Sequence, residues 1–252
     1  MLVDQTSGLP ERELLVSEGI RSHLLDGLIF SPIAMGREEL ERRRDDTPLV
    51  LLGERIFDGP ADHIAIDNVG AARDATGHLL GLGRRRIAAI GDQRHEPSGR
   101  TAHLRLDGYR QALGDAGLVV DEELVVPADC YHRDYGAAAA ARLLGLGEPP
   151  DAMLCFSDLL ALGAIRTLLV AGRRVPGDVA VVGFDDIEDG RFSTPTLTTI
   201  RPDKHEIARL AVSLLLSRMD GGRLRPPREV QVGFQVGYEL EVRESTVGVL
   251  PG

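Results

Sequence analysis

The sequence predicts an α/β protein with parallel sheets flanked by helices, and three observations lead to this class. Residues 179–184 form an unbroken apolar run that ends in two carboxylates, Asp185 and Asp186. A run without polar alternation is typical of a strand covered on both faces. Helix-like and strand-like segments alternate along the chain, which favours βαβ units. The composition, 43% hydrophobic and 27% charged residues, is that of a folded protein.

The first quarter of the chain starts this alternation. Leu2 and Val3 are expected to end a strand, and apolar residues then recur at helical spacing over 11–25. The next expected elements are strands at 28–30, 48–52 and 64–66, with a helix at 37–44 after the first of them.

The middle of the chain shows the pattern more clearly. The expected helices are 69–82, 101–116, 135–144 and 159–170, and they alternate with extended segments at 87–90, 119–120, 124–126 and 152–156. Ser157 and Asp158 stand where an N-cap is expected. After the run at 179–184 come an extended segment at 197–200, a helix at 203–219, short strands at 230–232 and 238–242, and a frayed tail at 247–252.

Composition and motifs exclude several functional classes. The net charge of −10 has the wrong sign for a chain that neutralises nucleic-acid phosphates by itself. Apolar runs are too short to span a bilayer and no signal-peptide pattern is seen, so a cytoplasmic location is expected. Cys130 and Cys155 have neither disulfide-framework nor zinc spacing. We find no phosphate-binding loop, catalytic set, metal motif or cofactor motif, so neither an enzyme nor a cofactor is expected.

The two carboxylates after the apolar run are the first candidate for a site. Ligands of open α/β sheets bind at the carboxyl ends of the strands, where Asp185 and Asp186 are expected. Aspartate is also a common turn former, so capping of the following turn is an equally good interpretation.

Several segments spread in order along the whole chain point to one family: 26–29, 31–32, 67–68, 105–109, 157–163, 175–178, 181–186, 195–200 and 243–246. Together they resemble the effector-binding core of the LacI/GalR-type transcription regulators. The resemblance implies a two-lobed, periplasmic-binding-protein-like (type I) fold. Three crossovers would join the lobes, near 66–67, 199–203 and 227–231, and an effector would lie in the cleft between the lobes.

The resemblance also implies the extent of each lobe. The N-terminal lobe would comprise 1–66 and 203–228, and the C-terminal lobe 67–202 and 229–252. The chain starts at what resembles the second strand of the N-terminal lobe, so the first strand and helix are expected to be missing, as is the helix-turn-helix head of these regulators.

By similarity, Asp185 would accept hydrogen bonds from effector hydroxyls or an amine, and Arg105 would donate them. Tyr131 lies where relatives carry an aromatic residue that stacks on the ligand, and Ser157 lies where relatives often carry an amide. The alternative for Arg105 is a surface arginine, Tyr131 could equally be a core residue, and Asp158 could contact the ligand or cap a helix. Weaker ligand-binding candidates are Thr101, Glu54 and Ser31.

The function implied is a sensor of a sugar or a similar polar metabolite that modulates DNA binding in a homodimer. DNA would be a partner only through a head that lies outside this sequence. Two alternatives stay open. One is a solute-binding protein for sugar uptake, and the other is a Rossmann-type enzyme.

Overall fold

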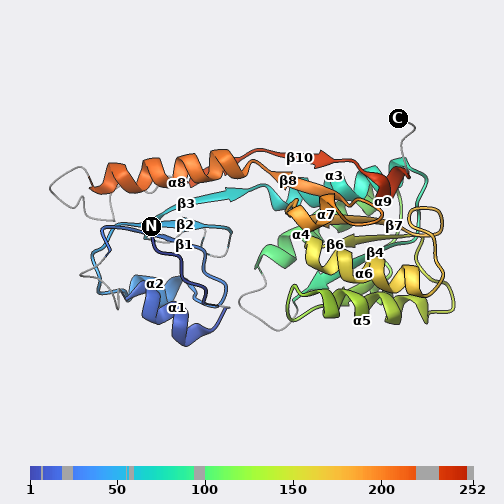
Figure 1. Cartoon of the computed structure of the whole chain (residues 1–252), viewed down its shortest axis with the longest axis horizontal. Helices are drawn as coiled ribbons and strands as arrows, with labels where there is room; N and C mark the ends of the chain where they lie inside the picture. Colours follow the sequence, from blue (N-terminus) through green and yellow to red (C-terminus); the bar gives the residue numbers. More distant parts are fainter. Residues whose placement is uncertain are drawn as a thin grey trace. The chain divides into compact units, whose positions relative to one another are not determined.

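The computed structural model describes residues 1–6, 8–18, 25–54, 56, 60–93, 100–219 and 233–248. The chain divides into two compact units (Figure 1), and both contain the predicted parallel strands flanked by helices, so the α/β class is confirmed. Unit 1 comprises Met1–Ile66, Glu96–Thr101 and Asp203–Gly237, and unit 2 comprises Asp67–His95, Ala102–Pro202 and Tyr238–Gly252.

Unit 1 contains a four-stranded parallel sheet in the order β1-β2-β3-β9. Its strands are β1 (Leu28–Phe30), β2 (Leu49–Leu52), β3 (Asp62–Ile66) and β9 (Gly233–Val236). The helices are α1 (Pro10–Ser17), α2 (Arg37–Glu41) and α8 (Lys204–Met219), and α8 packs against the first three strands. Phe30, Leu40 and Leu51 belong to the core.

Two predictions for unit 1 differ from the structure, and two others fall on residues that it does not describe. Leu2 and Val3 lie outside any strand and are exposed, because no neighbouring strand pairs with them in the described part of the chain. The expected helix at 11–25 ends at Ser17, and residues 19–24 lie outside the described residues. The expected strand at 230–232 and the expected lobe boundary at 228/229 also lie outside them. The described β9 pairs with β3, and the last of the three segments of unit 2 begins at Tyr238.

Unit 2 contains a six-stranded sheet in the order β10-β8-β7-β6-β4-β5, in which only the pairing of β10 with β8 is antiparallel. The strands are β4 (Ile87–Asp92), β5 (Val125–Pro127), β6 (Ala152–Cys155), β7 (Ala180–Phe184), β8 (Thr198–Pro202) and β10 (Tyr238–Glu241). Every residue of β4, β6 and β7 is buried, as the apolar runs predict.

Helices cover this sheet on its two faces (Figure 1). They are α3 (Asn68–Gly81), α4 (Arg100–Asp115, with its first two residues in unit 1), α5 (Arg133–Leu144) and α6 (Asp158–Val170), together with the short α7 (Glu188–Arg191), α9 (Glu244–Val247) and the 3-10 turn η2 (Glu122–Leu124). Helices α5 and α6 pack closely because Gly163 and Gly136 have no Cβ: one added at Gly163 would lie 1.9 Å from the Arg133 carbonyl oxygen.

The short elements of unit 2 were not predicted. Helix α7 falls within a segment that was not assigned. The turn η2 includes Leu124, the first residue of the extended segment expected at 124–126, and α9 ends at Val247, the first residue of the expected tail. Val119 and Val120 do not form a strand. None of the helices in the described part of the chain has the length and apolar character that a membrane crossing requires.

Candidate ligand-binding site

The carboxyl ends of β4, β6 and β7 lie next to one another at one edge of the unit 2 sheet, because these strands are parallel and adjacent. Strand β7 ends at Phe184, and the chain turns at once through Asp185 and Asp186, whose φ angles are 107° and 48°. Positive φ is uncommon for residues other than glycine, so surrounding contacts must hold this turn. One of them is the hydrogen bond that the Asp185 N–H donates to the Ile200 carbonyl at 2.9 Å.

Arg105 reaches this turn from α4 and is held on three sides. Its Nε donates to Oδ1 of Asn68 at 2.7 Å, and its Nη1 donates to the carbonyl oxygen of Phe156. The guanidinium carbon lies 3.5 Å from the centroid of the Phe184 ring, in cation–π geometry. Nη2 lies 3.8 Å from Oδ1 of Asp185. The arginine is 7% exposed, so its orientation is fixed before any ligand arrives.

The two consecutive aspartates have opposite surroundings. The Asp185 side chain is 44% exposed, whereas the Asp186 side chain is fully buried. Asp186 accepts hydrogen bonds from Arg191 and, at 2.6 Å, from Arg243. Burial by itself raises the pKa of Asp186, but the two arginines outweigh it and the pKa lies below its ordinary value. Asp186 therefore anchors the turn, and Asp185 is the carboxylate that faces solvent.

Tyr131 lies near Arg105 and Asp185. Its hydroxyl donates to the Gly91 carbonyl at the end of β4, at 3.1 Å, and the side chain is partly buried. Burial raises the pKa of Tyr131 to about 12, and nearby Asp185 and Asp92 act in the same direction while Arg105 opposes them. The structure thus brings Tyr131, Arg105 and Asp185 together.

Ser157 and Asp158, which follow β6 at the start of α6, both make hydrogen bonds within the protein. Ser157 caps α6, its Oγ accepting from the Leu160 N–H at 3.3 Å. Asp158 is 1% exposed. Its Oδ1 accepts from the Thr199 hydroxyl at 2.6 Å and its Oδ2 from the Ile187 N–H at 2.8 Å. Burial raises the pKa of Asp158 to about 7, although both hydrogen bonds act to lower it.

The other three sequence candidates belong to unit 1. Glu54 is 6% exposed and accepts from the Ile66 N–H at 3.2 Å and from the Thr101 hydroxyl at 3.1 Å. Ser31 is exposed just beyond the end of β1. Glu54 and Thr101 therefore lie together, and a role of any of the three in ligand binding stays a prediction.

Sequence reasoning missed two groups that shape the site. Asn68 and the ring of Phe184 hold Arg105, yet neither was singled out as a functional residue. Asn68 did belong to a segment that supported the family resemblance, and Phe184 directly precedes Asp185, so position relative to the expected strand end was the available signal.

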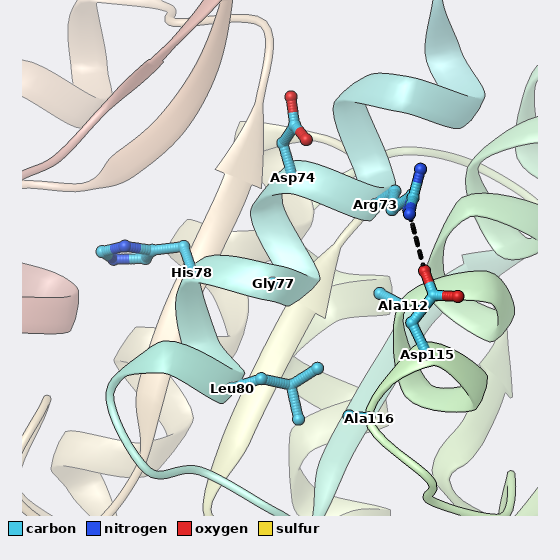
Figure 2. A pocket seen from close by; sticks show the side chains of 8 residues that line it. All are labelled: Arg73, Asp74, Gly77, His78, Leu80, Ala112, Asp115 and Ala116. Carbon is cyan, nitrogen blue, oxygen red and sulfur yellow. Dashed lines mark hydrogen bonds and ion pairs between the residues drawn. The ribbon is translucent and has the colours of Figure 1, made fainter.

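A separate hollow of about 690 Å³ lies on the surface of unit 2, over α3 and α4. Figure 2 shows the ion pair of Arg73 and Asp115 on one side of it, with His78 pointing away from that pair. Asp74 accepts from Tyr238, and His78 lies 3.0 Å from the Thr246 hydroxyl. None of the ligand-binding residues predicted from the sequence lines this hollow.

Comparison with known proteins gives consistent matches. Residues 76–246 match a family model described as "Periplasmic binding protein-like domain". The HTH-type transcriptional repressor CytR of Escherichia coli K12 is 37% identical over 182 residues, which cover 72% of this chain and 52% of CytR. The chain therefore aligns with about half the length of that relative. The HTH-type transcriptional regulator CelR of Thermobifida fusca is 39% identical over 239 residues, which cover 90% of this chain and 68% of CelR.

Solved structures agree with these relatives. A protein from Sanguibacter keddieii DSM 10542, described as a LacI-family transcriptional regulator, is 47% identical with a TM-score of 0.86, and the match covers 98% of this chain and 87% of that one. A complex of the transcriptional regulator CelR with cellobiose is 32% identical with a TM-score of 0.78, covering 94% of this chain and 71% of that chain.

Proposed function

Since the chain belongs to the LacI family of transcription regulators, we propose that it is an effector-sensing core that binds a small sugar and thereby modulates DNA binding. Asp185, Arg105 and Tyr131 are the residues of unit 2 to which we assign direct ligand contact.

The observation that carries this proposal is the pairing of Arg105 with Asp185 at the carboxyl end of β7. A sugar hydroxyl is both a donor and an acceptor. The exposed Asp185 carboxylate can accept from one hydroxyl, and Arg105, already oriented by Asn68 and Phe156, can donate to another. Such pre-orientation lowers the entropic cost of binding. The nearby ring of Tyr131 offers an apolar face for the C–H side of a sugar.

Cellobiose is the first probe to use, because the CelR relative was solved with it. Wild-type protein would be titrated with cellobiose by isothermal calorimetry, alongside the variants Asp185→Asn and Asp115→Asn. The second is a matched control, since Asp115 also forms an arginine pair on the surface of unit 2 but lies at the hollow on α3 and α4.

Loss of a hydrogen bond to a charged group costs about 1.5–3 kcal/mol, so Asp185→Asn is expected to weaken binding by about 10- to 150-fold. Asp115→Asn is expected to bind like wild type. Equal affinity of Asp185→Asn and wild type would contradict the assignment of the site, and no binding of cellobiose or of a panel of other neutral sugars would contradict the proposed effector class.

Further parts of the proposal rest on the relatives. The relatives named above are regulators, which favours a non-enzymatic, cytoplasmic role over sugar uptake or catalysis. The chain matches only part of the length of these HTH-type regulators. We therefore propose DNA binding by similarity to the relatives and assign it to no residue of this chain. We also propose a homodimer, for which light scattering should give about twice the 27.2 kDa chain mass.

A further inference from the structure

Asp158 is a buried carboxylate at the start of α6 to which the proposed site assigns no ligand contact. Both of its oxygens are bonded to segments that surround the Asp185 turn. Oδ2 accepts from the N–H of Ile187, two residues after Asp185, and Oδ1 accepts from the hydroxyl of Thr199 in β8. Asp158 therefore joins α6 to the turn and to the strand beside it.

Thr199, the partner of Oδ1, also contacts the turn. The Thr199 oxygen accepts from the Asp186 N–H at 3.4 Å, and the carbonyl of Ile200, the next residue in β8, accepts from the Asp185 N–H. Gly183 leaves the space for this arrangement, since a Cβ there would lie 2.2 Å from Oδ1 of Asp158. The positive φ angles at Asp185 and Asp186 are thus held through hydrogen bonds on both sides of the turn.

On the basis of the proposed function, we propose that Asp158 is a positioning residue. In its ionised form it holds the β7–α7 turn so that the Asp185 carboxylate faces the ligand, and its protonation weakens sugar binding.

The physical reason is the direction of the hydrogen bonds. An ionised carboxylate only accepts, so it can bind the Ile187 N–H and the Thr199 hydroxyl together. A protonated Asp158 must donate from one oxygen. If that donor is Oδ1, the Thr199 hydroxyl has to turn toward the Ile200 carbonyl, 3.3 Å away, which already accepts from the Asp185 N–H. Protonation therefore changes the bonds that hold Asp185.

The surroundings place this protonation near neutral pH. Burial raises the pKa of Asp158 to about 7, and the carboxylates of Asp185 and Asp186 act in the same direction. From β6 the neighbouring titratable group is the thiol of Cys155, whose own pKa is raised by burial. From β8 the facing group is the neutral hydroxyl of Thr199.

Stability and affinity should then respond to pH in opposite ways. The folded state binds the Asp158 proton more tightly than the unfolded state, whose pKa is near 3.9. The contribution of this group to stability is therefore largest below about pH 4, falls as pH rises toward 7, and is flat above that. Sugar affinity should instead rise through pH 7, because the ionised form holds the turn.

The variant Asp158→Asn tests this, because an amide has the shape and the donor–acceptor pair of a protonated carboxyl. Wild-type affinity for cellobiose is expected to fall about fivefold from pH 8 to pH 6, the difference between a charge-assisted and a neutral hydrogen bond. Asp158→Asn should have the low-pH affinity of wild type at both pH values and should be at least as stable as wild type at pH 8. The same pH dependence in the variant as in wild type, or a loss of stability at pH 8, would overturn the proposal.

A second measurement needs no ligand and so separates this proposal from the proposed function. The backbone amide signals of Asp185 and Ile187, followed by NMR without sugar, should titrate near pH 7 in wild type and not in Asp158→Asn. If they titrate while cellobiose and other sugars fail to bind, Asp158 positions the turn and the effector class is wrong. If they do not titrate, Asp158 does not act on the turn, whatever binds.

Discussion

Asp185 and Asp186 are neighbours in sequence, yet replacing each by asparagine should affect a different property of the protein. Asp186→Asn should destabilise unit 2, because the buried carboxylate carries bonds from both Arg243 and Arg191. Asp185→Asn should leave stability almost unchanged while weakening sugar binding. Asparagine has the size of aspartate, so the comparison isolates the charge.

The magnitudes follow from burial. Removing one partner of a buried ion pair costs about 3–5 kcal/mol. The Arg191 side chain is 52% exposed and can turn to water, whereas that of Arg243 is 17% exposed, so we expect the lower end, about 3 kcal/mol, for Asp186→Asn. The Asp185 side chain is 44% exposed, and Arg105 keeps its bonds to Asn68 and Phe156, so about 0.5 kcal/mol or less is expected there.

Tyrosine fluorescence measures this difference selectively. The chain has no tryptophan, and all its tyrosines lie in unit 2, at positions 109, 131, 135 and 238. Urea unfolding followed by this signal therefore reports on unit 2. With a slope of about 2 kcal/mol per molar urea, the midpoint of Asp186→Asn should fall by about 1.5 M. If the two variants had midpoints within about 0.3 M of each other, the reasoning that burial decides the outcome would be wrong.

Three further predictions use the same assays. Gly163→Ala should destabilise unit 2 by more than about 2 kcal/mol in urea unfolding, because its Cβ would meet the Arg133 carbonyl, whereas Gly77→Ala, with open space, should stabilise it by about 0.5–1 kcal/mol. Arg105→Lys should cost about 2 kcal/mol of stability and abolish measurable cellobiose binding, since lysine lacks the planar fork; wild-type affinity would contradict this. Tyr131→Phe should lower the free energy of unfolding by about 1 kcal/mol in urea but retain cellobiose binding in calorimetry, because only the hydroxyl bond is lost, and loss of binding would assign the hydroxyl to the ligand.

The sequence was sufficient for the fold class because the apolar runs of unit 2 are covered on both faces, and this burial leaves a pattern along the chain. It also placed Asp185 at a strand end, and the family resemblance indicated Arg105 as a donor to the same ligand. The sequence pattern by itself could not tell the surroundings of Asp185, Asp186 and Asp158 apart, because these depend on residues far along the chain: Arg243, for example, is 57 positions from Asp186. Three aspartates near strand ends look equivalent until their partners are known.

The strands near the two chain ends show the same limit. Leu2 and Val3 have a strand-like composition, but a strand forms only where a neighbour pairs with it, and they are exposed. Strand β9 was not expected at Gly233–Val236, and its pairing with β3 is a contact across more than 160 residues of chain. The local sequence pattern therefore predicts which segments are buried better than it predicts which strands pair.

The charges around the site lead to one more prediction, about the class of sugar. The guanidinium groups of Arg191 and Arg243 are bonded to the Asp186 carboxylate, and Arg105 is paired with Asp185. Positive charge at this edge of unit 2 is therefore already matched by carboxylates, and Asp92 adds another near Tyr131.

A phosphate ester would bring a charge of about −1.5 to −2 to this edge. It would face carboxylates, and each of the three arginines just named is already paired with one of them. The desolvation of the phosphate would therefore not be compensated. Neutral sugars should therefore bind more tightly than their phosphate esters. Competition against bound cellobiose checks this: glucose should displace it at a lower concentration than glucose 6-phosphate does, and the reverse order would show that unit 2 does not set the charge preference of the site.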